Sequence, residues 1–150
     1  MQRFPLIAVL LTLESRGEMN VVDIACAVSQ LLKNIVVQTQ ANDVIEGPKI
    51  VALLVRIGQI WKGCRAFYIA SDALSSYILK GEELAKVFEE CVDGGDINSY
   101  LRPMYECIGS NREREKIALV FLKECSFYSL NFENICNHVL PPFFNLTLLS

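Results

Sequence analysis

The chain of 150 residues is long enough for one domain with its own core, because a chain of this size buries about 70% of the surface that it exposes when unfolded. Its formal net charge is -3, and the basic and acidic side chains are scattered along it. Nucleic acids and anionic membranes bind clustered Lys and Arg, so we expect neither as the main partner. No apolar run reaches the roughly 20 residues that cross a bilayer, and we expect no membrane-spanning segment.

The cysteine pattern favours a reducing compartment. Most of the cysteines fall on apolar stripes of predicted helices, and no two of them form a C-x-x-C pair, which indicates buried, reduced thiols rather than disulfides. The apolar residues 5–11 are not followed by the small-x-small cleavage site of a signal peptide. We therefore expect a cytoplasmic or nuclear protein. The six cysteines are Cys26, Cys64, Cys91, Cys107, Cys125 and Cys136.

Apolar residues recur with the 3.6-residue period of α-helices, and the strict alternation of strands is absent. The sequence therefore predicts an all-α fold in a single domain that spans residues 1–150. Pro103 is expected to break one of the helices, and Ser110 with Glu113 forms a capping-box pattern at the start of the next. The predicted helices cover residues 5–15, 21–38, 48–62, 65–80, 82–92, 103–108, 112–128 and 131–140.

The stretch from Pro48 to Lys80 is the predicted centre of the fold. Proline suits the first turn of a helix, because its missing N–H has no partner there in any case. Apolar residues then follow at helical spacing, and Gly63 separates a first apolar helix from a second. The first helix has so few polar positions that it must be covered on most sides. Its predicted inner face holds Ile50, Leu53, Leu54, Ile57 and Trp61, widened by Val51, Val55 and Ile60.

A shift of the chain by 43 residues superposes two successive helices without a gap. Pro5, Ile7, Leu10 and Leu11 fall on Pro48, Ile50, Leu53 and Leu54, and Ala27, Leu31 and Ile35 fall on Ala70, Leu74 and Ile78. A looser third copy lies near a shift of 47 residues. Chance agreement between amphipathic helices is one explanation. The other is a repeat of helix pairs, each of which buries its apolar face against its neighbours.

The period of 43 to 47 residues resembles that of the HEAT and armadillo families, whose repeats span about 40 to 47 residues. The resemblance implies antiparallel helix pairs stacked into an array over residues 5–128. It also implies that the last helix of each repeat lines a concave surface for an extended peptide or a partner helix. These helices are residues 21–38, 65–80 and 112–128. The helix at residues 82–92 departs from the pattern as an insertion or a third helix of its repeat.

The resemblance leads to a set of expected partner-binding residues. Gln30 and Asn34 would bond the backbone of an extended peptide, and Tyr77, which the 43-residue shift places on Asn34, would continue this polar stripe together with Asp72 and Ser76. Each of them is otherwise an ordinary solvent-facing polar residue. Trp61 belongs either to the core or to a binding cleft, because tryptophan is enriched at interface hot spots.

Residues for catalysis or for binding a metal or cofactor are not apparent. His138 is the single histidine, and Cys136 lies two positions away, on a different face of a predicted helix. The acidic residues around Gly94 lack the spacing of an EF-hand, and no phosphate-binding glycine loop is present. We therefore expect no metal, no cofactor and no enzymatic activity, and the predicted function is a protein–protein interaction module.

The sequence leaves two alternatives to an interaction module built of helix repeats. One is a compact bundle of seven or eight helices, similar to Bcl-2-like regulators, with the helix after Pro48 at its buried centre. The Asn-Trp-Gly-Arg signature of that family is absent, although Gly58, Trp61 and Arg65 lie close together in sequence. The other alternative is a small helical enzyme. A bundle is compact and round, whereas a repeat array is elongated.

The last residues of the chain are apolar and follow a double proline. Burial of such side chains stabilises by about 1.5–3 kcal/mol each, so we expect them to be covered. The predicted contact is with a second copy of the chain, which makes a homodimer an expected assembly. The residues expected at that contact are Phe143, Phe144 and Leu148.

Overall fold

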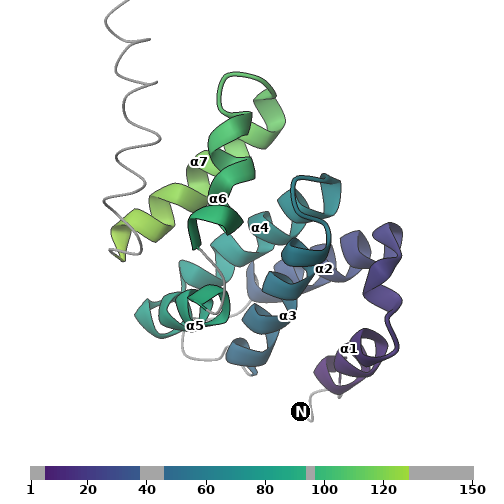
Figure 1. The fold of residues 1–150 in the computed structure, drawn as a ribbon. Helices are drawn as coiled ribbons and strands as arrows, with labels where there is room; N and C mark the ends of the chain where they lie inside the picture. The colour runs from purple at the N-terminus through teal and green to yellow at the C-terminus, as the bar shows by residue number, and fades with distance from the viewer. Residues whose placement is uncertain (1–5, 38–45, 94–96, 129–150) are drawn as a thin grey trace, which may run out of the picture.

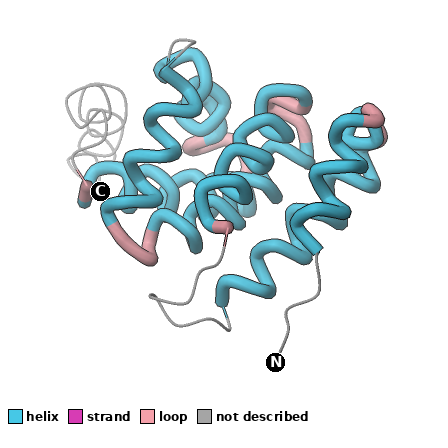
Figure 2. The backbone as a smooth tube through the Cα atoms, turned by 90° about the horizontal axis from the view of Figure 1, so that it is seen from below, coloured by secondary structure: helices cyan, strands magenta, loops and turns pink. Residues whose placement is uncertain are grey.

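The all-α prediction is confirmed in the computed structural model (Figures 1 and 2). The structure describes residues 6–37, 46–93 and 97–128, and these residues contain no strand. The predicted helix at residues 131–140, Cys136, His138 and the tail with Phe143, Phe144 and Leu148 lie outside the described residues. The helices are α1 (Leu6–Ser15), the 3-10 helix η1 (Glu18–Asn20), α2 (Val22–Val37), α3 (Gly47–Ile60), α4 (Arg65–Ile78), α5 (Glu82–Asp93), α6 (Ile97–Cys107) and α7 (Arg112–Phe127).

The helices pack in two layers (Figure 1). In one layer α2, α4 and α7 lie side by side, with α4 in the middle and all three running in the same direction. In the other layer α3 lies between α1 and α5, and α6 packs against α7 and α5. The buried centre is therefore α4. The bundle alternative had predicted α3 at this place, and that prediction is wrong. Helix α4 can be enclosed on most sides because small side chains, among them Ala66, Ala70 and Ala73, let its neighbours approach closely.

Pro48 lies in the first turn of α3, and the backbone turns between α3 and α4 at Gly63, whose φ of +76° favours glycine. Both features match the sequence prediction. The prediction that Ile60 belongs to the inner face of α3 is wrong, however, because its side chain is 46% exposed. Ile60 is the last residue of α3, where the chain leaves the layer to form the turn.

The predicted break at Pro103 is wrong, because α6 continues from Ile97 to Cys107 with Pro103 inside it. A proline in a helix removes one backbone hydrogen bond and costs about 3 kcal/mol. Apolar side chains on both sides of the proline, including Leu101 and Met104, are fully buried. Their burial offsets this cost. The Pro103 carbonyl also accepts a hydrogen bond of 3.0 Å from the hydroxyl of Tyr68.

Helix α7 begins at Arg112, where the predicted helix begins, but its capping residue is not the predicted Ser110. Its N-cap is Asn111, whose side-chain oxygen accepts a hydrogen bond of 3.1 Å from the backbone N–H of Arg114. Ser110 instead donates its hydroxyl back to the carbonyls of Glu106 and Cys107 at the end of α6. Asparagine and serine are equally good N-caps, so two adjacent capping residues cannot be ranked by type alone.

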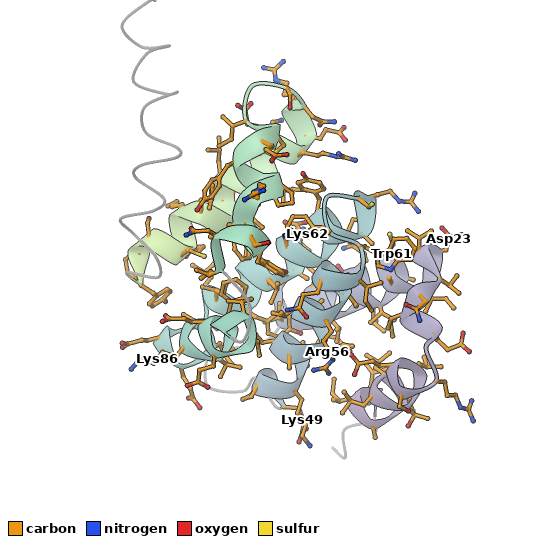
Figure 3. The ribbon with its side chains drawn as sticks, in the orientation of Figure 1. Asp23, Lys49, Arg56, Trp61, Lys62 and Lys86 are labelled. Carbon is orange, nitrogen blue, oxygen red and sulfur yellow. The ribbon has the colours of Figure 1, made fainter. Side chains whose placement is uncertain are left out.

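Three side-chain contacts join residues that are 42 positions apart. Arg56 on α3 pairs with Glu14 on α1, the Trp61 indole N–H donates to the Met19 carbonyl at 2.8 Å, and Arg65 pairs with Asp23 at 3.1 Å. Figure 3 labels Arg56, Trp61 and Asp23, and shows Arg56 on the side of α3 that faces α1. The segment from α1 to α2 therefore runs parallel to the segment from α3 to α4, at a constant offset.

Every buried residue of α2 has a buried counterpart on α4 at this offset. Ser29 donates to the carbonyl of Ala25, and Ser71, 42 residues later, donates to the carbonyl of Phe67, in both cases at 2.8 Å. The buried residues Ala25, Val28, Ser29, Leu32 and Val36 of α2 correspond to the buried residues Phe67, Ala70, Ser71, Leu74 and Ile78 of α4.

The predicted alignment by 43 residues is therefore wrong for α2 and α4 by one position. It placed Leu31 on Leu74 and Ile35 on Ile78, but Leu31 is 40% exposed and Ile35 is half-buried, whereas Leu74 and Ile78 are fully buried. In α2 another apolar residue follows each of these positions: Leu32 follows Leu31, and Val36 follows Ile35. Hydrophobicity alone therefore cannot fix the alignment.

The described cysteines are all free. Cys107 and Cys125 are buried, as expected, but Cys26 and Cys91 are only half-buried, and Cys64 is exposed. Cys64 precedes α4 in the turn after Gly63, so the helical period does not reach it. The prediction of buried thiols is therefore wrong for Cys64.

Candidate functional site

One stripe of residues on α2 and one on α4 remain uncovered by the packing of the two layers. In both helices the stripe follows the spacing i, i+4, i+7, i+11, i+14 of a single helix face. Each residue on α2 lies 42 positions before its counterpart on α4. We call the two together the α2–α4 stripe. Its residues are Asp23, Ala27, Gln30, Asn34 and Val37 on α2, all exposed, and Arg65, Ile69, Asp72, Ser76 and Leu79, which are exposed or half-buried and follow the same face of α4 and its end.

Gln30 and Asn34 form the polar middle of the stripe on α2. The amide nitrogen of Gln30 donates a hydrogen bond of 3.1 Å to the side-chain oxygen of Asn34. This bond fixes the two amide groups relative to each other. It leaves the Asn34 amide nitrogen as a donor and the Gln30 oxygen as an acceptor, the two kinds of group that a peptide backbone requires.

On α4 the corresponding residues are Asp72 and Ser76. Asp72 forms an ion pair of 2.6 Å with Lys33 on α2, and this pair joins the two helices across their seam. Ser76 is half-buried and corresponds to Asn34 at the offset of 42. The structure therefore brings together four of the six residues that the sequence analysis expected at the site: Gln30, Asn34, Asp72 and Ser76.

Tyr77 does not belong to the stripe, which corrects the sequence prediction. Its side chain is fully buried, and its hydroxyl donates a hydrogen bond of 2.7 Å to the carbonyl of Leu32 on α2. Burial raises the pKa of Tyr77 well above its usual range. The error follows from the shift of 43 residues, because one position along a helix turns a side chain by about 100°.

Trp61 lies apart from the stripe, in the turn that ends α3, where it packs against η1 (Figure 3). The indole is half-buried, and its one N–H group donates to the Met19 carbonyl. Its polar group is therefore used inside the fold. The partly exposed ring is the part that remains available for contact.

A second feature was not predicted from the sequence. A cavity of about 390 Å³ lies between the α3–α4 turn, the first half of α4, and the turn from α6 to α7. We call it the α4–α7 cavity. Its charged side chains are Lys62, Glu106 and Arg114. They come from three separate segments, so no spacing in the sequence groups them.

The α4–α7 cavity also contains a thiol and a phenol. Burial raises the pKa of Cys107 and of Tyr68, and in Tyr68 the neighbouring thiol adds to this effect while Arg114 opposes it. Both groups are therefore protonated at neutral pH. A protonated thiol is a poor nucleophile, so this arrangement suits binding better than covalent chemistry.

No family model, curated protein or solved structure matches the chain. The resemblance to HEAT and armadillo repeats is thus neither supported nor contradicted by a relative. Within residues 6–37, 46–93 and 97–128, no helix is both long and apolar enough to span a bilayer. Over the same residues, His, Cys, Asp and Glu side chains form no group of three that would bind a metal ion. The α2–α4 stripe and the α4–α7 cavity are the two features from which a function can be inferred.

Proposed function

We propose that the protein is a non-enzymatic interaction module that binds an extended peptide of a partner protein across α2 and α4. The observation that supports this proposal is the offset of 42 residues. It places the polar stripe of one helix beside that of a parallel neighbour, on a face that the described helices leave open. Asn34 and Ser76 then lie at the same height on the two helices and serve as its central anchors.

The proposal includes a repeat architecture. In this view, the pair α1 and α2 and the pair α3 and α4 are two copies of one unit, and α7 occupies the third position beside α4. The parallel run of α2, α4 and α7 and the shared serine bonds of Ser29 and Ser71 support it. Stacked helix pairs of this kind expose one row of helices as an extended binding surface.

The dimensions of the stripe suit an extended chain. Packed helices lie about 8–10 Å apart, and an extended peptide rises about 3.3 Å per residue. A peptide that crosses from α2 to α4 therefore meets Asn34 and Ser76 about three residues apart. Amide and hydroxyl side chains can bond its backbone N–H and C=O groups without reading its sequence, so specificity must come from other contacts.

The proposed setting is the cytoplasm or the nucleus. Cys64 is an exposed free thiol, which a reducing compartment preserves and an oxidising one does not. The homodimer contact through Phe143, Phe144 and Leu148 remains a prediction, because these residues lie outside the described part of the chain.

A peptide-display selection on the full chain tests the proposal. The affinity of a selected peptide is then measured by fluorescence polarisation for the wild type and for the double variant Asn34→Ala, Ser76→Ala. We expect the double variant to bind about tenfold more weakly or worse, since each lost side-chain hydrogen bond contributes about 0.5–1.5 kcal/mol.

The matched control is the double variant Glu83→Ala, Lys86→Ala, because both residues are exposed on α5, away from the stripe (Figure 3 labels Lys86). Its affinity for the peptide should equal that of the wild type. A peptide that binds both double variants as tightly as the wild type would place the binding surface elsewhere and refute the proposal.

A further inference from the structure

The α4–α7 cavity has a geometry that points to a specific ligand. Tyr68, Gly63 and Pro103 are among the residues that line it, and Pro103 lies beside Gly63. Lys62 reaches across from the α3–α4 turn and donates a hydrogen bond of 2.7 Å to the hydroxyl of Ser99 on α6 (Figure 3 labels Lys62). The cavity volume of about 390 Å³ is within the range of small-molecule and side-chain binding sites.

Arg114 is held in a defined position inside this cavity. Its guanidinium lies over the ring of Tyr68, 4.6 Å from the ring centre, and its backbone N–H is bonded to the Asn111 side chain. The Tyr68 ring is itself fixed, because its hydroxyl is bonded to the Pro103 carbonyl and its edge packs against Phe67. A cation–π contact of this kind does not use up the N–H donors of the guanidinium, which carries five of them.

Arg114 has no carboxylate within ion-pair distance among the described residues. It is half-buried, so part of its surface is open to a ligand in the cavity. Its planar N–H groups match a carboxylate in a bidentate manner. Lys62 supplies a second positive charge to the same cavity.

The charge balance of the cavity selects among anions. Among the residues that line the cavity, Lys62 and Arg114 contribute two positive charges and Glu106 one negative charge, so the lining has a net charge of +1. Tyr68 and Cys107 add none, because burial keeps both protonated. A single carboxylate neutralises this charge, whereas a phosphate dianion would leave an excess negative charge beside Glu106.

We propose that the α4–α7 cavity binds an acidic side chain, a glutamate or aspartate, of the same partner peptide that lies on the α2–α4 stripe. The proposal rests on the proposed function. Tyr68 and Ser76 are eight residues apart on α4, or about 12 Å along the helix axis. About four residues of extended chain span this distance, so a peptide that crosses α4 at Ser76 and then turns to run along α4 reaches both places.

The test uses single blocked amino acids as probes, so it does not depend on any selected peptide. N-acetyl-glutamate N-methylamide, its glutamine counterpart and its phosphoserine counterpart are titrated into the ¹⁵N-labelled full chain at constant ionic strength and pH 7. The signals to follow are the side-chain N–H of Arg114 and the backbone N–H of Cys107. We expect a saturable shift with the glutamate probe, a weaker response to the phosphoserine probe and none to the glutamine probe.

Variants assign the binding to the cavity. Arg114→Gln removes the charge but keeps a polar side chain, and it should weaken binding of the glutamate probe about tenfold or more, because a charge-assisted hydrogen bond contributes about 1.5–3 kcal/mol. Lys116→Gln removes an exposed charge from the same helix and should change nothing. Glu106→Gln should bring the affinity for the phosphoserine probe up to that for the glutamate probe. The thermal unfolding of each variant shows whether it is folded, and Lys62→Gln serves as a second cavity variant if Arg114→Gln is not.

A glutamate response that persists in the Arg114→Gln variant would overturn the proposal, as would equal responses to glutamate and glutamine. A phosphoserine probe that binds more tightly than glutamate to the wild type would refute the charge argument. None of these outcomes depends on Asn34 or Ser76, and the side-chain amide signal of Asn34 and the backbone amide signal of Ser76 serve as an internal reference for the α2–α4 stripe. A failure of the cavity is therefore distinguishable from a failure of the peptide surface.

Discussion

Helices α2 and α4 follow one pattern of burial but occupy different places in the molecule. Their innermost positions, such as Leu32 and Leu74, are fully buried in both helices. Their flanks differ, because among the described helices α4 has a neighbour in its layer on both sides, α2 and α7, whereas α2 has only α4. Leu31 of α2 is 40% exposed, while its counterpart Ala73 on α4 is fully buried.

This difference shows that the position of a helix in the layer, and not its period, decides what its flanks can hold. The enclosed helix carries a small residue where the outer helix carries a leucine. The enclosed helix also carries Tyr77, whose hydroxyl donates a hydrogen bond to the Leu32 carbonyl of α2. The counterpart of Tyr77 on the outer helix is Ile35. The comparison yields four predictions, from the largest expected effect to the smallest.

The largest effect concerns the positions that the two helices share. Leu32→Ala and Leu74→Ala should each lower the free energy of unfolding by about 2–5 kcal/mol, because each removes a fully buried side chain and leaves a cavity. Urea unfolding of the two variants and of the wild type measures this loss in the free energy of unfolding. A small loss for Leu32→Ala alone would mean that the two helices are not equivalent at this position.

The flanks should respond differently. Ala73→Leu forces a larger side chain into the space between α4 and its neighbours and should cost about 1–3 kcal/mol. Ala27→Leu, on the open face of α2, should change stability by less than about 0.5 kcal/mol. Thermal unfolding of the two variants measures the difference. Equal unfolding temperatures for Ala73→Leu and Ala27→Leu would contradict the enclosed position of α4.

Tyr77 makes the enclosed helix sensitive to alkaline pH. Because burial raises the pKa of Tyr77, the folded chain keeps this proton above about pH 10, where tyrosine in an unfolded chain loses it. Its contribution to stability is therefore complete below pH 10 and is lost as the pH rises toward the native pKa, by about 1.4 kcal/mol per pH unit.

Tyr77→Phe removes this dependence together with the hydrogen bond to Leu32. At pH 8 the wild type should be more stable than the variant by about 0.5–1.5 kcal/mol, and by about pH 11.5 the order should be reversed. Urea unfolding at a series of pH values measures both. A difference that does not change with pH would show that the hydroxyl is in contact with water.

The smallest effects are those of the ion pairs that cross the seam between α2 and α4. Lys33 and Asp72 are each about one-third exposed, so a double-mutant cycle should give about 0.5–1 kcal/mol for their coupling. Asp23 and Arg65 are 86% and 63% exposed, and their coupling should be about 0.2 kcal/mol or less. Addition of 1 M salt should remove the second coupling and only reduce the first. Equal couplings would contradict the burial that distinguishes the two pairs.

The sequence predicts the helices well because each of them carries its own signal. The period of apolar residues gives the helices, and Pro48 and Gly63 mark the start of α3 and the turn into α4. The sequence also places Gln30 and Asn34 on one face of α2, and Asp72 and Ser76 on one face of α4, because each pair is four residues apart.

What the sequence misses depends on contacts between segments. The predicted alignment of α2 with α4 was shifted by one residue and therefore misplaced Tyr77. The pattern of apolar residues cannot reveal this error, because Leu31 and Ile35 are each followed by another apolar residue. The hydrogen bond from Trp61 to Met19 and the ion pairs Arg56–Glu14 and Arg65–Asp23 fix the offset of 42 residues in space. The α4–α7 cavity is formed by side chains from three segments, and only the packing of α4 against α7 brings Arg114 over Tyr68.

The parallel offset of 42 residues is the central claim, and the indole proton of Trp61 tests it most directly. Trp61 is the single tryptophan, so its N–H gives one unambiguous signal in the NMR spectrum of the full chain. Its hydrogen bond to the Met19 carbonyl predicts slow exchange with solvent and a nuclear Overhauser effect to the α-proton of Asn20, the residue that follows this carbonyl. An indole proton that exchanges as fast as that of free tryptophan, with no such effect to η1, would contradict the stacking of the two helix pairs.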